Sequence, residues 1–367
     1  MAPRLLFAVT LTGGHTVPAL AVAEAVCQRY SDAEIRFAGV AQGVEARLVP
    51  RSGYCLETIP VIGLSRHLHL DLLQFPWMLV KGMVRSLHIL STYRPHAVIC
   101  TGGYVSGPIG MAAWLLGIPL VLHEQNNFPG ITVRVLSRVA VQVYLAFEGA
   151  ARRLGGRERL VVGNPVRSGW TRVERAEARR RCGLTLDRPT LLVVGGSQGA
   201  AGINQAVARA LPALVEREIQ VLWQTGKPGY ETAVSEARAF RGHVVVKDFI
   251  DDMEAAYSAA DVALTRAGAM TVAELTHLGV PAVLVPLPTA SEHHQDYNAL
   301  ATAQAGAARM VRQSDLNAAR LASTVVELMD DEAALAQMRA RSRRLAVPDA
   351  AERIVAGMSR VGLLRRE

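Results

Sequence analysis

Short apolar runs alternate with helix-like segments along most of this chain, and this alternation predicts its fold class. The runs are rich in aliphatic and β-branched residues, as buried strands are. They are Leu5–Val9, Ala97–Cys100, Leu120–His123, Gln142–Leu145, Thr190–Val194, Gln220–Trp223, Val244–Val246, Val262–Thr265 and Ala282–Val285. Because strands separated by helices form βαβ units, we expect an α/β protein with two mainly parallel sheets.

The helix-like segments carry recognisable start signals and one break. Helices are predicted at Val17–Tyr30, with Pro18 in its first turn, at Val173–Arg181 and at Ala350–Leu364, and the adjacent pair Asp251-Asp252 is predicted to cap a further helix. The turn-forming cluster Gly163–Arg167 reads as a hinge. A length of 367 residues favours two domains. We predict domains at 1–163 and 164–345, with the C-terminal helix, about residues 346–367, packed back on the first.

Charge and cysteine content narrow the class of protein. The net charge is +8, and arginines gather in 172–188 and 339–344. Both runs lie on helical patterns without interleaved aromatic residues, so we interpret them as solvated helix faces and expect no nucleic-acid partner. The four cysteines are scattered, which favours reduced thiols in a cytosol. The first apolar run is too short for a signal peptide, and no stretch reaches the roughly 18 apolar residues of a membrane span.

Two glycine-rich turns follow predicted strands, one in each half of the chain. Thr12–His15 follows Leu5–Val9, and Gly195–Ala200 follows the strand that ends at Val194. A tight turn between a strand and a helix places backbone N–H groups where an anion binds. Neither turn is a G-x-G-x-x-G or a P-loop, so dehydrogenase and NTPase functions are disfavoured.

Other polar clusters also follow predicted strands. They are Thr101–Tyr104, His123–Asn126, Gln224–Gly226, Asp248–Ile250, Arg266–Glu274 and Gln295–Asn298. Ligands of open parallel sheets bind beyond the carboxyl ends of the strands. In Arg266–Glu274, small residues let the backbone approach a diphosphate, and the Glu274 carboxylate has two oxygens to accept ribose hydroxyls. The alternative is an ordinary strand–loop–helix joint with a surface glutamate.

Taken in order, these motifs resemble the MurG family of bacterial N-acetylglucosaminyltransferases. The set is Thr12-Gly-Gly-His15, Thr101-Gly-Gly-Tyr104, His123-Glu-Gln-Asn126, Gly163-Asn-Pro-Val-Arg167, Gly195-Gly-Ser-Gln-Gly-Ala200, Gln224-Thr-Gly226, Arg266–Glu274 and Gln295-x-x-Asn298. The resemblance runs from about residue 8 to residue 310. It implies the GT-B fold of glycosyltransferase family 28, in which two Rossmann-like domains with parallel sheets face a central cleft.

The resemblance also implies a reaction. The donor would be UDP-GlcNAc and the acceptor lipid I, which is undecaprenyl-pyrophosphoryl-MurNAc-pentapeptide. GlcNAc would pass with inversion to the C4 hydroxyl of MurNAc, forming lipid II in peptidoglycan synthesis, with no metal and no cofactor. Alternatives are another GT-B enzyme that uses a UDP-sugar on a different lipid or small molecule, and a nucleotide-sugar-binding scaffold without turnover. Retention of His15 and Glu124 disfavours the scaffold.

Site residues follow from the same resemblance. Donor contacts would be Thr12, Gly13, Gly14, Asn126, Arg167, Ser197, Ile250, Ala269, Met270, Thr271, Glu274 and Gln295, and the acceptor pyrophosphate would meet Gly13, Gly14, Gly102, Gly103 and Tyr104. Ile250 would read the uracil edge with its backbone. His15 is our first choice of catalytic base, because imidazole titrates near neutrality, and Glu124 is the second. The alternative for His15 is helix capping or phosphate binding.

The family usually has two further glycines where this chain has Thr10 and Leu11, which predicts a stiffer acceptor loop.

One apolar stretch suggests contact with a membrane. Leu72–Val80 is strongly apolar, has Arg66, Lys81 and Arg85 beside it, and is too short to span a bilayer. It is either a buried helix of the first domain or a patch that dips into an anionic membrane surface through Leu72, Phe75, Trp77 and Leu79. In the second case Trp77 and Trp114 would lie at headgroup depth. The second interpretation predicts a peripheral protein on the cytoplasmic face of the cell membrane.

Overall fold

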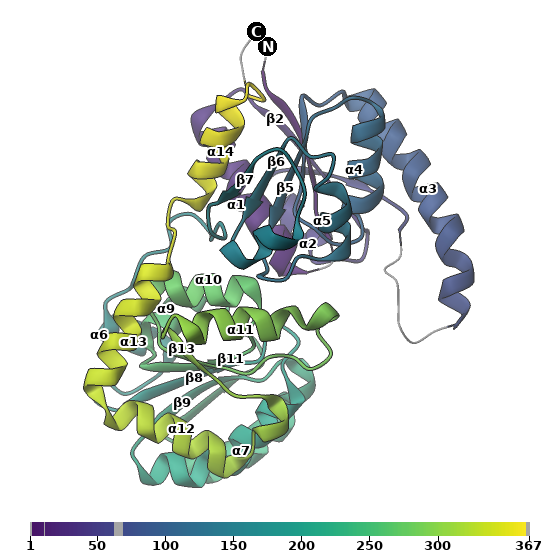
Figure 1. The fold of residues 1–367 in the computed structure, drawn as a ribbon. Coiled ribbons are helices and arrows are strands. Elements are labelled where there is room, and N and C mark those ends of the chain that lie inside the picture. The colour runs from purple at the N-terminus through teal and green to yellow at the C-terminus, as the bar shows by residue number, and fades with distance from the viewer. Residues whose placement is uncertain (1, 11, 62–68, 365–367) are drawn as a thin grey trace. The chain divides into compact units, whose positions relative to one another are not determined.

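The computed structural model describes residues 2–10, 12–61 and 69–364. For residues 69–75 it describes the backbone but not the side chains. The chain divides into two compact units (Figure 1). Unit 1 consists of Met1–Ser168 and Val347–Glu367, and unit 2 of Gly169–Ala346. The division thus falls after Ser168, whereas we predicted it after residue 163.

Unit 1 is a parallel sheet with helices on both faces. Its elements are β1 (Arg4–Ala8), α1 (Gly13–Arg29), β2 (Glu34–Gly39), α2 (Glu45–Arg51), β3 (Cys55–Thr58), α3 (His69–Tyr93), β4 (Ala97–Cys100), α4 (Ser106–Leu115), β5 (Leu120–Glu124), α5 (Ile131–Leu136), β6 (Gln142–Leu145), η1 (Glu148–Arg153), β7 (Arg159–Val161) and α14 (Ala350–Arg360). The strand order is β3-β2-β1-β4-β5-β6-β7. The alternation of side chains along β1 explains the two cores: Leu5 and Phe7 pack toward α1, α2 and α14, while Leu6 and Ala8 pack toward α3, α4 and α5.

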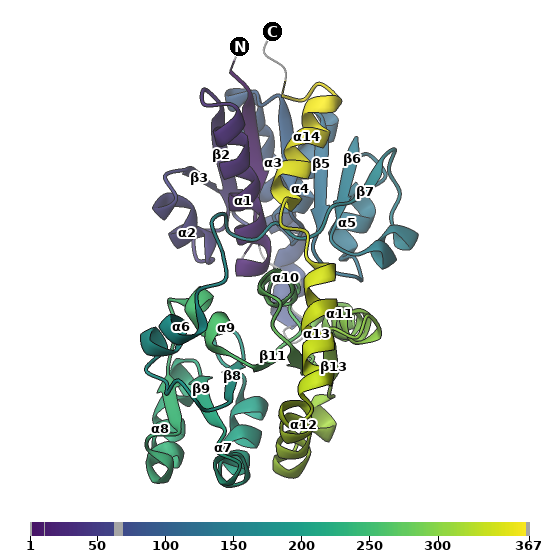
Figure 2. The ribbon, with the colours of Figure 1, turned by 90° about the vertical axis from the view of Figure 1, so that its left-hand side faces the viewer.

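Unit 2 repeats this architecture with a smaller sheet. Its elements are α6 (Arg175–Cys182), β8 (Thr190–Val194), α7 (Ala201–Glu216), β9 (Gln220–Gln224), η2 (Lys227–Gly229), α8 (Tyr230–Ala237), η3 (Arg238–Phe240), β10 (Val244–Lys247), α9 (Met253–Ala259), β11 (Val262–Thr265), α10 (Ala269–Leu278), β12 (Ala282–Leu284), η4 (Ser291–His293), α11 (His294–Gln304), β13 (Ala308–Met310), η5 (Gln313–Asp315), α12 (Ala318–Asp330) and α13 (Glu332–Leu345). The strand order is β10-β9-β8-β11-β12-β13. One face of the sheet packs on α7 and α12, which lie side by side in Figure 2.

The predicted fold class is confirmed. Every strand pair that the structure describes is parallel, and each sheet is interleaved with helices. Asp252 caps α9 as predicted, since its Oδ1 accepts from the Ala255 N–H at 3.1 Å. Among the residues with described positions, no helix combines the length and the apolar character that crossing a membrane requires.

Helix boundaries were predicted less well: the last helix ends at Arg360 rather than Leu364, the helix predicted at Val173–Arg181 is Arg175–Cys182, and the start of the first helix was wrong. The first helix begins at Gly13 rather than Val17, because extended Thr12 acts as its N-cap and the Thr12 carbonyl accepts from the N–H groups of His15 and Thr16 at 3.3 and 3.2 Å. Pro18 therefore lies in the second turn. His15 lies in the first turn of α1 instead of in a loop, so its side chain projects from a rigid element.

Candidate functional site

The strand order reverses direction at one place in each unit, and several of the predicted site residues follow the two strands on either side of it. In unit 1 the reversal lies between β1 and β4, and in unit 2 between β8 and β11. Ligands of doubly wound sheets bind at such switch points, beyond the carboxyl ends of the strands. Of the predicted donor contacts, Thr12, Gly13, Gly14, Asn126 and Arg167 belong to unit 1, and Ser197, Ile250, Ala269, Met270, Thr271, Glu274 and Gln295 to unit 2.

In unit 1 the loop after β4 lies against the start of α1. Gly102 and Gly103 both have positive φ, 92° and 74°. A Cβ on Gly102 would lie 3.2 Å from the His15 ring, and one on Gly103 would lie 2.7 Å from Thr10. Glycine suits both positions for two reasons: the backbone has a positive φ, and a Cβ would crowd a neighbouring side chain. Tyr104, which follows them, is half-buried, and burial raises the pKa of its phenol.

Thr10 stands where the family usually has glycine, and it joins the two loops of unit 1. Its side chain is 2% exposed, and its Oγ1 accepts a hydrogen bond from the Val105 N–H at 3.2 Å. Gly103 leaves the space that this side chain fills. The hydrogen bond is a side-chain tether to the segment after β4, and it supports the prediction of a stiffer loop. Leu11, the second departure from the family, lies outside the described residues.

His15 is held by backbone groups at the switch point of unit 1. Its Nδ1 lies 2.6 Å from the Thr101 carbonyl oxygen and 3.0 Å from Oε1 of Gln125. The Thr101 hydroxyl in turn donates to the His15 carbonyl at 3.0 Å. The imidazole is half-buried and its orientation is set by neighbours in two loops. A ring fixed in this way suits a group that must meet a substrate in one geometry.

Glu124, the second candidate for the base, is engaged by its own loop. It is 3% exposed; Oε1 accepts from the Asn126 N–H at 2.9 Å and from Asn126 Nδ2 at 3.2 Å, and Oε2 accepts from the Gly130 N–H at 3.2 Å. Burial raises the pKa of Glu124 to about 7, although these hydrogen bonds act to lower it. This geometry favours Glu124 as the organiser of the loop that carries Asn126, and it favours His15 as the base.

In unit 2 the turn Gly195–Ala200 is braced by the loop after β9. Gly199 has φ of 76° and Gly226 has φ of 72°. A Cβ on Gly199 would collide with the Thr225 carbonyl, and one on Gly226 would collide with the backbone at Gln198. Ser197, the predicted phosphate ligand, is exposed at the tip of this turn. The two backbones therefore pack directly on each other and hold the tip in one conformation.

Gln224 is a site residue whose role sequence reasoning missed. Its Nε2 donates to the Gly196 carbonyl at 3.0 Å, and its Oε1 accepts from the Ile250 N–H at 2.9 Å. It thus ties the glycine turn to the segment predicted to read uracil. Because the Ile250 N–H is engaged here, the carbonyl of Ile250 is the backbone group suited to a base edge. The motif Gln224-Thr-Gly226 was visible in the sequence, but the hydrogen-bond partners of the Gln224 side chain were not.

The start of α10 presents backbone amides beside a carboxylate. Ala269, Met270 and Thr271 form the first turn of this helix, whose N-cap is Gly268 without a side-chain cap. Such a turn attracts anions. Glu274 follows on the same helix and is half-buried; its Oε2 accepts from the Tyr257 hydroxyl at 3.1 Å. The Tyr257 ring makes an edge contact with Trp170, with centroids 6.2 Å apart.

Gln295 lies at the start of α11, after an unusual stretch of backbone. Glu292 and His293 have φ of 51° and 54°, values that cost a non-glycine residue about 1–3 kcal/mol each. The Gln295 Oε1 accepts from the Leu287 N–H at 2.9 Å, and Asn298 Nδ2 donates to the Ala267 carbonyl at 3.1 Å. This segment is therefore tied to the loops after β11 and β12.

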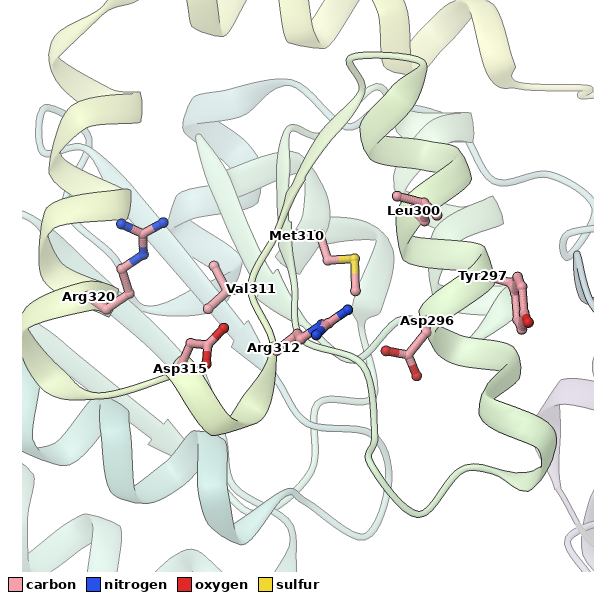
Figure 3. Close-up of a pocket in the computed structure, with 8 residues that line it drawn as sticks. All are labelled: Asp296, Tyr297, Leu300, Met310, Val311, Arg312, Asp315 and Arg320. Carbon is pink, nitrogen blue, oxygen red and sulfur yellow. The ribbon is translucent and has the colours of Figure 1, made fainter.

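A pocket of about 640 Å³ lies between α11, the end of β13 and the start of α12 (Figure 3). It is lined by Asp296, Tyr297 and Leu300 of α11, by Met310, Val311 and Arg312 at the end of β13, and by Asp315 and Arg320 beside the start of α12. Asp296 directly follows Gln295 in the sequence, but Gln295 is not among the residues that line the pocket. Acidic and basic side chains face the same cavity.

Side chains that could hold a metal ion are scattered along the chain. Within residues 2–10, 12–61 and 69–364, no three His, Cys, Asp or Glu residues lie close enough together to do so.

Two doubly wound units with glycine-rich loops at their switch points are the architecture of the GT-B fold, to which many glycosyltransferases belong. Family comparison agrees: residues 5–145 match the glycosyltransferase family 28 N-terminal domain, and residues 190–354 match the glycosyltransferase family 28 C-terminal domain. The chain belongs to glycosyltransferase family 28. Within it, the chain belongs to the family of the bacterial pyrophosphoryl-undecaprenol N-acetylglucosamine transferases.

Curated relatives match nearly the whole chain. A protein of Desulforamulus reducens is 40% identical over 352 residues, which cover 94% of this chain and 95% of that protein. One of Salinibacter ruber is 41% identical over 354 residues, which cover 96% and 95%. Each is named UDP-N-acetylglucosamine–N-acetylmuramyl-(pentapeptide) pyrophosphoryl-undecaprenol N-acetylglucosamine transferase.

Solved structures agree on the fold. The crystal structure of Acinetobacter baumannii MurG matches with a TM-score of 0.79 at 31% identity and covers 98% of this chain and 100% of that one. CalG4, the calicheamicin glycosyltransferase, matches with a TM-score of 0.69 at 16% identity, covering 98% and 99%. The second likeness concerns the fold alone.

Proposed function

We propose that this protein transfers GlcNAc from UDP-GlcNAc to the C4 hydroxyl of MurNAc in lipid I, with inversion, and so forms lipid II. The observation that carries the proposal is the identity of 37–41% with named transferases over nearly the full length of the chain. The positions of His15, Glu124, Ser197 and Glu274 at the carboxyl ends of the strands support it, because this is where the reaction of a GT-B enzyme takes place.

Unit 2 binds the donor in this proposal. The first turn of α10 and the turn Gly195–Ala200, with Ser197, offer backbone amides to the diphosphate. Glu274 accepts the ribose hydroxyls, and the Ile250 backbone reads uracil. Because the Gln295 oxygen is engaged by Leu287, the amide nitrogen of Gln295 is the group that meets a sugar hydroxyl. The remaining predicted donor contacts belong to unit 1 and are Thr12, Gly13, Gly14, Asn126 and Arg167.

Unit 1 binds the acceptor and supplies the base. The start of α1, with Gly13 and Gly14, and the loop Gly102–Tyr104 hold the pyrophosphate. His15 Nε2 removes the proton from the C4 hydroxyl while that oxygen attacks the anomeric carbon of GlcNAc. The bond from this carbon to the β-phosphate oxygen breaks, and its electron pair leaves with UDP. Helix N-termini and the glycine turn stabilise the charge that develops on the diphosphate.

A membrane-facing surface brings the enzyme to its lipid acceptor. Trp77 and Leu79 on α3 are 62% and 44% exposed, and Trp114 at the end of α4 is 51% exposed. The side chains of Leu72 and Phe75 lie outside the described residues. Lys81 lies 5.2 Å from the Trp77 ring centroid and adds positive charge. We infer peripheral attachment to the anionic cytoplasmic face of the cell membrane.

A transfer assay with labelled UDP-GlcNAc and a lipid I analogue tests the function. We expect a disaccharide product with a β-linked GlcNAc and stoichiometric release of UDP. An acceptor analogue that lacks the C4 hydroxyl of MurNAc is the matched control and should give no product. Transfer to other lipid acceptors but not to lipid I would assign the protein to a different GT-B activity, and binding without transfer would make it a scaffold.

A further inference from the structure

A hydrogen-bond chain runs through unit 1 from His15 to the segment that leaves the unit. Gln125 Oε1 lies 3.0 Å from His15 Nδ1, and Gln125 Nε2 lies 2.9 Å from His123 Nδ1. His123 Nε2 lies 3.1 Å from the Gly163 carbonyl oxygen. Gln125 and His123 are 2% and 1% exposed. A half-buried candidate base is thus linked to groups that water does not reach.

The orientation of the Gln125 amide is determined by a carbonyl. Besides His123 Nδ1, its Nε2 lies 3.0 Å from the His123 carbonyl oxygen, which can only accept. Turning the amide over would place two acceptor oxygens against each other. The amide nitrogen therefore faces His123, and the amide oxygen faces His15.

That orientation determines which nitrogen of His15 carries the proton. Nδ1 faces two oxygens that can only accept, the Thr101 carbonyl at 2.6 Å and Gln125 Oε1 at 3.0 Å. Nδ1 must therefore be the protonated nitrogen of the neutral ring, and Nε2 carries the lone pair. When Nε2 accepts a proton, the Nδ1–H bonds to both oxygens become charge-assisted and strengthen.

His123 holds the other end of Gln125. Its Nδ1 accepts from Gln125, so its Nε2 carries the proton and donates to the Gly163 carbonyl. Burial lowers the pKa of His123 to about 4, which keeps it neutral and in this tautomer at cytosolic pH. Asn164 Nδ2 donates to the Gln125 carbonyl at 3.1 Å, so the backbone of Gln125 is held as well as its side chain.

We propose that Gln125 is a positioning residue for the transfer reaction: with the Thr101 carbonyl it holds His15 so that Nε2 is the base, and it stabilises the imidazolium that forms. This inference rests on the proposed function and adds to it a neutral amide in the place where other enzymes use a carboxylate to orient a histidine. Gln125 itself does not touch the substrate. His123 and Gly163 act through it.

Kinetics of Gln125→Leu test the proposal, with Gln142→Leu as the matched control. Gln142 is an equally buried glutamine of unit 1, whose amide contacts Tyr144, Glu158 and the Gly357 carbonyl instead of His15. We expect Gln125→Leu to lower kcat by about 10-fold and to leave KM for UDP-GlcNAc within about 2-fold, as loss of one hydrogen bond to a charged transition-state group predicts. Gln142→Leu should leave kcat near that of the wild type.

A double variant separates positioning from folding. If Gln125 acts through His15, then adding Gln125→Leu to His15→Ala lowers kcat no further. A further 10-fold loss of kcat in the double variant, relative to His15→Ala, would overturn the proposal. Wild-type kcat in Gln125→Leu would overturn it as well. Absence of GlcNAc transfer by the wild type would instead count against the proposed function.

The tautomer is measurable in the wild type without any activity. Long-range ¹H–¹⁵N correlation spectra of protein labelled on histidine nitrogens, with His15→Gln for assignment, should show Nδ1 of His15 protonated. An Nε2–H tautomer would contradict the proposal even if the Leu variant fails to fold.

Discussion

The Tyr257 hydroxyl donates a hydrogen bond to Oε2 of Glu274 over 3.1 Å. Tyr257 is 1% exposed, and burial together with Glu274 raises the pKa of its phenol well above the ordinary value, so the hydroxyl remains a donor. This contact fixes the carboxylate that we expect to bind the donor ribose.

Tyr257→Phe is therefore expected to weaken donor binding. A hydrogen bond to a charged group is worth about 1.5–3 kcal/mol, so KM for UDP-GlcNAc should rise by about 10-fold with a smaller change in kcat. Tyr144→Phe is the matched control, because it removes a buried hydroxyl that bonds to Gln142 in unit 1. Equal effects of the two variants on KM would refute a specific role of Tyr257.

His15→Ala should remove the base and leave the donor site intact. General-base catalysis contributes about 10²–10⁴-fold, and we expect kcat to fall by that factor while KM for UDP-GlcNAc stays within about 3-fold. His243→Ala removes a histidine of unit 2 that contacts Glu218 and serves as the control. Nearly full kcat in a folded His15→Ala protein would show that another group takes the proton.

The buried Glu124 predicts a pH dependence of stability. Its folded-state pKa of about 7 lies above its ordinary value of 4.5. A carboxyl group whose pKa is raised by folding stabilises the folded state fully below about pH 4.5. That stabilisation is lost as the pH rises through about 7. Relative to Glu124→Gln, which does not titrate, the wild type should lose about 3 kcal/mol of unfolding free energy across this window. Urea titrations of both proteins at several pH values check this, and a constant difference between them would contradict it.

The exposed tryptophans predict reversible, salt-sensitive attachment to membranes. Burying a large apolar side chain is worth about 1.5–3 kcal/mol, so removing two partly inserted ones with Trp77→Ala and Trp114→Ala should weaken binding to anionic vesicles by about 10-fold or more. High salt should weaken it further. The control is Leu186→Ala, which removes an apolar side chain of unit 2 that is 51% exposed. Unchanged vesicle sedimentation of the double variant would exclude this surface.

The parallel sheets could be predicted because their signals are local. Each buried strand is a continuous apolar run, and a polar or glycine-rich cluster follows it directly in the sequence. Strands Glu34–Gly39 and Cys55–Thr58 were not among the predicted runs, because both mix charged residues with apolar ones, and Cys55–Thr58 also lies at the less buried edge of the sheet. The start of α1 was missed because two glycines read as a loop, although Thr12 caps a helix there.

The residues that orient the site could not be predicted, because their partners are distant in sequence. Gln224 contacts Ile250 across 26 positions, and His15 contacts Gln125 across 110. Both glutamines lie in polar clusters that the sequence marks, but nothing in those clusters shows which groups their side chains contact. Only the folded chain, which aligns the carboxyl ends of the strands, brings these pairs together.

The direct backbone packing of Gly199 on Thr225 has a thermodynamic consequence. Since no side chain separates the two loops, the conformation of the phosphate-facing turn is set when unit 2 folds, before any nucleotide arrives. The entropy of ordering that turn is then part of the folding free energy and is absent from the binding free energy. Calorimetry of UDP binding should accordingly report a heat-capacity change no larger than the contact area of the ligand accounts for.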